Sequence, residues 1–148
     1  MIQMNVLRAA HAVGIEKLIL GANSTVEYSG ISVNTTQNIT PRTDYKNMII
    51  SGVGVSKTYS PGTSFSGTLT INTSGATGLI LQTPVTINTG LTLTKGKINT
   101  DATNILTLGA SATLSGGSDS SYVVGPMVRN VAGTSTYLFP LGKGGRYR

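Results

Sequence analysis

Side chains capable of acid–base or metal chemistry are few and widely spaced along the 148 residues of this chain. His11 is the only histidine and cysteine is absent, whereas catalytic triads and zinc sites need several converging groups. Asp101 and Asp119 lie 18 residues apart, which is close to the length of one coil in a repeat fold. They could therefore stack as the carboxylate pair that a glycosidase requires. Their surroundings, NTDATN and GSDSS, are also typical of turns, in which aspartate bonds to nearby backbone.

The remaining acids add little to the case for catalysis or for a cation site. Glu16, Glu27 and Asp44 are isolated from one another. Calcium-binding repeats carry acids in every coil, whereas GGSDSS occurs once. We therefore predict that the chain is not an enzyme, and that it has no catalytic residue, no cofactor-binding residue, no cofactor and no metal ligand.

Aromatic residues near the end of the chain are a candidate sugar-binding platform. In TYLFPLG, strand alternation places Tyr137 and Phe139 on one face, and Tyr122 lies in a preceding strand candidate. Core packing gives the same pattern, and it is favoured because phenylalanine is usually buried. We predict that these rings belong to the core.

The formal charge of +6 reflects a shortage of acids more than an excess of bases. Most lysines are scattered between apolar runs, and only KGGRYR, residues 143–148, concentrates positive charge. Nucleic-acid binding requires a motif or a patch on one face. We predict no nucleic-acid partner and interpret KGGRYR as a solvated chain end.

From Asn23 onward the chain is a succession of short strand candidates separated by Gly, Asn, Pro and Ser. In GTLTIN, Leu69 and Ile71 face one way and the threonines between and before them face the other, because side chains alternate across a strand. The candidates are STVEYS, ISVN, NMIIS, GTLTIN, GLILQ, PVTIN, LTLTK, ILTLG, ATLS, YVVGPMV and TYLFPLG. Charged residues make up only 11% of the chain, and Thr, Ser, Asn and Gly take their place. The pattern predicts a mainly β fold.

A coarser repeat suggests how these strands are arranged. The pairs Leu69 with Ile71, Leu91 with Leu93, and Ala112 with Leu114 recur at intervals of about 21 or 22 residues. This interval matches one coil of a parallel β-helix, or β-solenoid, in which each coil stacks on the next. An antiparallel β-sandwich remains the alternative, because it also shows short alternating strands with regular turns.

The first part of the chain has a different character. Ile2, Val6, Ala9 and Val13 recur at helical spacing, and IEKLIL, residues 15–20, reads as a short strand. Arg8, Glu16 and Lys17 interrupt the apolar segment of residues 6–20, so we predict neither a signal peptide nor a membrane span. We divide the chain into residues 1–22, a helix-strand segment that is a cap or a chimeric start, and residues 23–148, a β-solenoid region expected to be part of a longer protein.

Residues 23–148 resemble the repetitive stalk regions of large surface-exposed or secreted proteins of bacteria that use type IX secretion. The resemblance rests on LTLTKGKINTDATNILTLG, on the following SYVVGPMVRNV and on FPLGKGGRYR. It implies a right-handed parallel β-helix that acts as a spacer or adhesive surface and has no catalytic residues. It also implies a module that follows the final segment.

Residues 1–30 resemble a segment of extended short-chain dehydrogenases, the nucleotide-sugar epimerases and reductases. The resemblance rests on NVLRAAHAVGIEKLIL followed by a Ser/Thr-rich stretch. It places Ser24 or Thr25 near the catalytic Ser/Thr of that family. The dinucleotide fingerprint GxxGxxG and the YxxxK pair of the family are missing from this sequence. An inactive fragment of such an enzyme is therefore the remote alternative.

These patterns lead to a functional expectation. We expect a non-enzymatic structural or adhesive segment of a bacterial cell-surface or secreted repeat protein, located at the cell surface or outside the cell. The alternative is a carbohydrate-binding module that uses the Thr/Asn face or the C-terminal tyrosines. Expected partners are surface glycans or other cell-surface proteins, and open solenoid ends could also allow end-to-end self-association.

Overall fold

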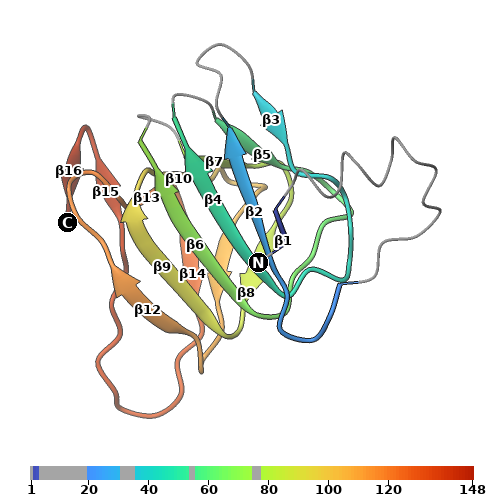
Figure 1. Cartoon of the computed structure of the whole chain (residues 1–148). Helices are drawn as coiled ribbons and strands as arrows, with labels where there is room; N and C mark the ends of the chain where they lie inside the picture. The colour runs from blue at the N-terminus through green and yellow to red at the C-terminus, as the bar shows by residue number, and fades with distance from the viewer. Residues whose placement is uncertain (1, 4–19, 31–35, 54–55, 75–77) are drawn as a thin grey trace, which may run out of the picture.

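The computed structural model describes residues 2–3, 20–30, 36–53, 56–74 and 78–148, and its main feature is a stack of short parallel strands (Figure 1). The largest sheet has six strands in the order β1-β2-β4-β6-β9-β12. Their bounds are β1 Ile2–Gln3, β2 Thr25–Gly30, β4 Asn47–Gly52, β6 Thr68–Thr73, β9 Gly90–Lys95 and β12 Thr113–Gly116. Sequence-distant segments therefore lie side by side in one regular surface.

Two further parallel sheets complete the coils. The second sheet has the order β13-β10-β7-β5-β3, and the third has the order β14-β11-β8. The bounds are β3 Gln37–Asn38, β5 Lys57–Tyr59, β7 Leu79–Leu81, β10 Ile98–Asn99 and β13 Val123–Val124, then β8 Val85–Ile87, β11 Leu106–Leu108 and β14 Met127–Arg129. A parallel bridge between Tyr45 and Phe65 continues the third side into the earlier coils.

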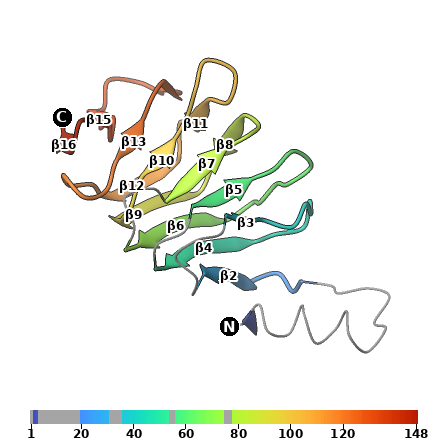
Figure 2. The ribbon, with the colours of Figure 1, turned by 90° about the horizontal axis from the view of Figure 1, so that it is seen from above.

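The chain winds through one strand of each sheet in turn, so the fold is a β-solenoid of about four turns. Every strand pairing within the three sheets of the described residues is parallel. The predicted solenoid is confirmed, and the antiparallel sandwich is wrong. Figure 2 shows the coils in succession, with the two ends of the chain at opposite ends of the stack.

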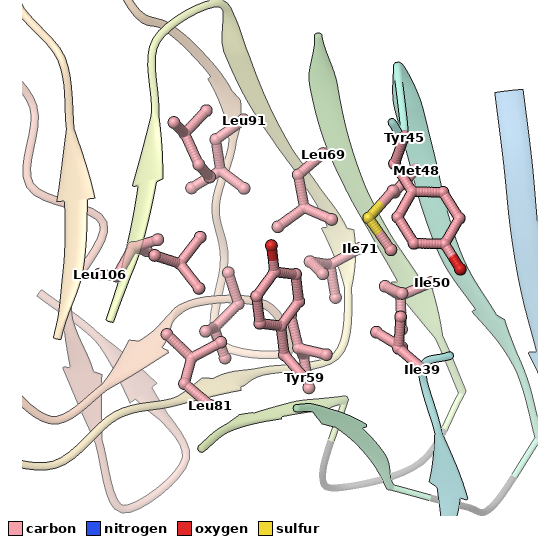
Figure 3. Packing of buried hydrophobic residues seen from close by; sticks show 14 of the residues in the cluster. Ile39, Tyr45, Met48, Ile50, Tyr59, Leu69, Ile71, Leu81, Leu91 and Leu106 are labelled. Atoms are coloured by element: carbon pink, nitrogen blue, oxygen red, sulfur yellow. The ribbon is translucent and has the colours of Figure 1, made fainter. Parts of the chain in front are cut away.

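The interior is built by the alternation that the sequence predicts. Leu69 and Ile71 of β6 are fully buried, whereas Thr70 between them is partly exposed. In the next coil Leu91 lies beside Leu69 and Leu93 beside Ile71. These inward side chains form columns that run along the stack and fill the space between the sheets (Figure 3). Burial of such columns is the main favourable contribution to folding.

One predicted register is wrong. Leu114 pairs with Leu91, and Gly116 rather than Leu114 pairs with Leu93, so Ala112 lies before the strand. The cause is the length of a corner: residues 109–112 separate β11 from β12, whereas only residues 88–89 separate β8 from β9. Ala112 is nevertheless buried, with its amide donating to the carbonyl of Gly109 in the turn.

The segment TYLFPLG also differs from the prediction, because residues 136–140 do not form a strand. Leu138 and Phe139 are exposed at 59% and 43%, and Tyr137 is half-buried. The Tyr137 hydroxyl bonds to the backbone amide and carbonyl of Ala132, which closes this stretch into a loop. Placing Tyr137 and Phe139 in the core was therefore wrong, whereas Tyr122 is buried as predicted.

At the start of the chain, Ile2 and Gln3 form a strand that pairs in parallel with Val26 and Glu27. A helix was predicted from Ile2, so the prediction is wrong at these two residues. The rest of that helix, with His11, and Glu16 of the predicted strand lie outside the described residues. Leu20, the last residue of IEKLIL, is buried. No helix with the length and hydropathy needed to cross a membrane occurs in the part of the chain that the structure describes.

Candidate functional site

The acids of the described residues are each engaged in a local contact. Glu27 accepts a hydrogen bond from the hydroxyl of Ser51 in the neighbouring strand. Asp44 pairs with Arg42 at 2.6 Å. The hydrogen bond from this guanidinium lowers the pKa of the Asp44 carboxyl, and the same contact raises the pKa of Arg42. These carboxylates support the corners and strands of the solenoid.

Asp101 and Asp119 do not form a carboxylate pair. Asp101 follows β10, and its Oδ1 accepts the backbone amides of Thr103 and Asn104 at 2.8 Å each. Hydrogen bonds from the amide and side chain of Asn104, and from the amide of Thr103, lower the pKa of Asp101. Asp119 precedes β13 and accepts the amide of Tyr147 at 2.7 Å. The two acids lie on different corners of the coil. Asp101 bonds to nearby backbone as its surroundings predict, whereas Asp119, also in a turn, bonds to the distant Tyr147.

The residues that could hold a metal are also dispersed. No group of three or more His, Cys, Asp or Glu side chains gathers anywhere within residues 2–3, 20–30, 36–53, 56–74 and 78–148. Ser24 and Thr25, the positions carried over from the dehydrogenase resemblance, lie at the start of β2. The Ser24 hydroxyl is buried without a hydrogen-bond partner. No acid–base pair that would activate it is present among these described residues.

Polar side chains form an ordered array on the outward side of the six-stranded sheet, which we call the outer threonine face. Strand pairing places its side chains in rows, with neighbouring strands about 4.8 Å apart. One row is Glu27, Ile49, Thr70, Thr92 and Ser115, a second is Ser29, Ser51, Asn72 and Lys95, and a third is Thr68, Gly90 and Thr113. Most of these side chains are partly or fully exposed. Such rows can bind a ligand through repeated hydrogen bonds.

Polar side chains at the edge of this face also secure the corners between coils. The Asn47 Oδ1 accepts both the amide and the hydroxyl of Thr68, at 2.9 and 3.1 Å. Two coils further, the hydroxyl of Thr113 donates to the carbonyl of Thr89 at 3.2 Å. Because these bonds join successive coils, they hold the outer threonine face rigid.

Inside the earlier coils the solenoid contains tyrosine hydroxyls, which the sequence did not indicate. Tyr28 and Tyr45 are buried, their hydroxyls are hydrogen-bonded to each other, and the Tyr45 hydroxyl donates to the Thr40 carbonyl at 2.9 Å. Burial, and the bond with Tyr28, raise the pKa of Tyr45 above its usual value. Burial raises the pKa of Tyr59, whose hydroxyl donates to the Thr63 carbonyl, to about 12. The hydroxyls of Tyr45 and Tyr59 therefore stay protonated at neutral pH, and all three hydroxyls are hydrogen-bonded within the core.

Lys57 is a charged residue in an otherwise mainly apolar interior. It lies on β5 in the inward column that continues with Leu79, Ile98 and Val123. The side chain is fully buried, and its Nζ has no hydrogen-bond partner. Desolvation lowers the pKa of Lys57 below its ordinary value. No strand was predicted over residues 57–59, and a lysine there offered no reason to place the side chain inside.

At the opposite end, the segment interpreted as a solvated chain end is an ordered hairpin. β15, Gly142–Lys143, pairs antiparallel with β16, Arg146–Tyr147 (Figure 1). The hairpin follows a parallel bridge between Val123 and Leu141, which extends the second sheet by one position. The sequence signal that could have revealed it is the Gly-Gly pair between the two strands, which is typical of a tight hairpin turn.

Comparison with known proteins did not identify relatives. No family model matches the chain, and neither a curated protein nor a solved structure shows significant similarity to it.

Proposed function

We propose that the chain is a non-enzymatic structural or adhesive segment of a bacterial cell-surface or secreted repeat protein. The observation that carries this proposal is the outer threonine face, a set of hydroxyl and amide rows on a scaffold with an aliphatic interior. The two ends of the chain lie at opposite ends of the coil stack, so the stack could hold two attached partners apart (Figure 2). This geometry suits a spacer.

Adhesion through such a face would depend on many weak contacts. A row such as Thr70, Thr92 and Ser115 repeats a hydroxyl from coil to coil. A partner with its own repeating hydroxyls can bond to several rows at once, and the combined affinity exceeds that of any single contact. The described acids are engaged in turns and strand contacts, which is also compatible with a role that involves no reaction.

A pulling experiment tests the spacer role. Because the chain has no cysteine, Asn23→Cys and Arg148→Cys provide unique attachment points at the two ends of the stack. We expect unfolding in steps that release about 70–80 Å, the extended length of one coil of about 22 residues. A smooth extension with no force-bearing step would contradict the proposal, because a spacer must resist tension along the stack.

A carbohydrate-binding module is the second candidate, and the rows of exposed hydroxyls on the outer threonine face favour it. A glycan array at protein concentrations near a millimolar should then show hits that the Thr70→Ala/Thr92→Ala variant loses. The matched control is Thr107→Ala, which removes a partly exposed threonine from the third sheet. An array without hits, or an equal loss in the control, would remove this candidate.

A further inference from the structure

The positive charge of the described residues is concentrated at the end of the stack where the hairpin lies. Lys95 and Lys97 flank Gly96 at the corner between β9 and β10, and Lys143 and Arg146 belong to the hairpin. We call these four residues the cationic corner. None of them has an ion-pair partner among the described residues, where Arg42 with Asp44 is the ion pair found. The acid beside them, Asp119, accepts the amide of Tyr147 and forms no ion pair with any of the four.

Backbone contacts bring the two pairs of cations together. The amide of Gly96 donates to the carbonyl of Ser120, which places Lys95 and Lys97 beside the loop that carries Asp119. The Lys97 Nζ lies 5.0 Å from the centre of the Tyr122 ring. The hydroxyl of the same tyrosine accepts the amide of Gly145 at the tip of the hairpin, at 2.9 Å. One ring therefore separates Lys97 from the hairpin turn.

The hairpin is held firmly enough to present its charges in a fixed place. Gly142 lies so close to Tyr122 that a Cβ there would come within 2.5 Å of the ring. The amide of Tyr147 is bonded to Asp119, and the ring of Tyr147 packs against Gly117. These contacts anchor one side of the hairpin on the last coil and leave Lys143 and Arg146 exposed.

Lys143 and Arg146 are directly paired across the hairpin. Paired residues project from the same face, and like charges in this position destabilise a β-hairpin. No carboxylate of the described residues pairs with either side chain to offset the repulsion. A bound anion would relieve it, so this arrangement is suited to a ligand that carries negative charge.

We propose that the cationic corner binds an anionic polysaccharide, one that bears carboxylate or sulfate groups. Lys95 occupies the row of the outer threonine face that includes Ser51 and Asn72. The corner is therefore continuous with a surface of hydroxyl and amide groups that can bond to sugar hydroxyls. The choice of a polysaccharide rests on the proposed adhesive function, whereas the anion site itself rests on the arrangement of the cations.

The surroundings favour a polysaccharide over a single-stranded nucleic acid. Binding of unpaired bases uses exposed aromatic faces for stacking. Tyr122 is buried at the corner, and the ring of Tyr147 is packed against Gly117. The rings near the cations are thus engaged within the fold, while the adjacent exposed groups are hydroxyls and amides.

The test is binding of the whole chain to dextran sulfate and to polygalacturonate at about 50 mM salt, with neutral dextran and duplex DNA as comparisons. We expect binding to the two anionic polysaccharides that weakens as salt screens the charges. Lys143→Gln/Arg146→Gln should weaken it at least about fivefold, and Lys95→Gln should weaken it about two- to threefold, because fewer cations face the ligand. The control Lys46→Gln removes one positive charge, as Lys95→Gln does, but lies next to Tyr45 in an early coil. It should change affinity less than about twofold.

The outcomes separate this inference from the proposed function. Absence of binding to both anionic polysaccharides, or an equal loss in Lys46→Gln, overturns the inference and leaves the pulling experiment unaffected. Binding of DNA about tenfold tighter than of either polysaccharide overturns the choice of ligand. Thermal melting of each variant verifies folding, and Lys95→Gln, on a different element, tests the site if the hairpin variant does not fold.

Discussion

Lys57 provides the sharpest test of the interior of this solenoid. On one side its neighbours in the inward column are aliphatic, beginning with Leu79 and continuing with Ile98, and on the other side it pairs with Gln37. The side chain is 0% exposed and its amine has no partner. A buried polar group without a hydrogen bond costs roughly 1–3 kcal/mol relative to an apolar group. The native lysine should therefore reduce the stability of the fold.

Replacing Lys57 by methionine keeps a long unbranched side chain and removes the amine. We expect the free energy of unfolding to rise by about 1–3 kcal/mol, which corresponds to an increase in Tm of roughly 3–9 °C for a chain of this size. Urea and thermal unfolding followed by circular dichroism measure both quantities. The matched control is Lys95→Met, in which the lysine is exposed and the expected change is within about 0.5 kcal/mol.

The pH dependence gives an independent check on the same residue. The unfolded chain binds the Lys57 proton up to a pKa near 10.5, whereas desolvation lowers the pKa of the folded chain. Between these two pKa values the unfolded state binds more protons, so this residue makes stability rise with pH, by at most about 1.4 kcal/mol per pH unit. Lys57→Met should lack this contribution between pH 7 and about 8.5, where tyrosines of the unfolded chain, with an ordinary pKa near 10, are almost fully protonated.

Two results would refute the reasoning about Lys57. One is a loss of more than about 1 kcal/mol in Lys57→Met, which would mean that the amine makes a favourable contact that its removal breaks. The other is an unchanged pH dependence in the variant, which would assign the titration to another group.

Further substitutions probe the two faces, a corner and the tyrosine pair. Leu93→Asp should abolish cooperative thermal unfolding because it buries a charge, whereas Thr92→Ser on the outer face should change stability by under about 1 kcal/mol; equal effects would contradict the inward and outward assignment. Gly96→Ala places a Cβ 2.0 Å from a threonine oxygen at a φ of +93°, so it should cost more than about 2 kcal/mol in urea unfolding, while Gly133→Ala, with a φ of +74° and no atom within 4 Å, should cost about 1 kcal/mol. A similar cost at both glycines would show that the contact at Gly96 is unimportant. Tyr45→Phe leaves a buried tyrosine hydroxyl without its acceptor and should cost about 1–3 kcal/mol in the same assay; a neutral result would show that the hydroxyl pair contributes nothing to stability.

The strands were predictable because their signal is local. The alternation of Leu69 and Ile71 with threonine requires only that one side of a strand be buried, and the repeat interval then indicates stacking. The corners were less predictable, since a corner can lengthen without disturbing the strands on either side. The extra residues before Thr113 shifted the register of Leu114 in this way.

Side-chain placement inside the first coils was hidden for a different reason. Composition rules place lysine outside and give no preference for tyrosine hydroxyls that find partners within the core. Strand alternation directs Tyr28 and Lys57 inward, and the neighbouring coils cover them. Tyr45 is bonded to Tyr28 in the same interior. The candidate sites were predictable only in part. The threonine face followed from alternation, but the cationic corner depends on a hairpin that bonds to Asp119 and Tyr122 of the last coil.

The division between inside and outside explains why this sequence reveals its fold more readily than its function. Each coil contacts mainly its neighbours, so the inward positions, such as Leu69 and Leu91, must match along the stack to be buried. Outward positions carry no such requirement, and the row that contains Ser51, Asn72 and Lys95 changes from hydroxyl to amide to ammonium without altering the pairing of the strands beyond a bulge. The chemistry that a partner would recognise is therefore set by outward residues that the fold itself does not dictate, and the cationic corner, where several of these residues carry positive charge, is where a specific ligand should be sought.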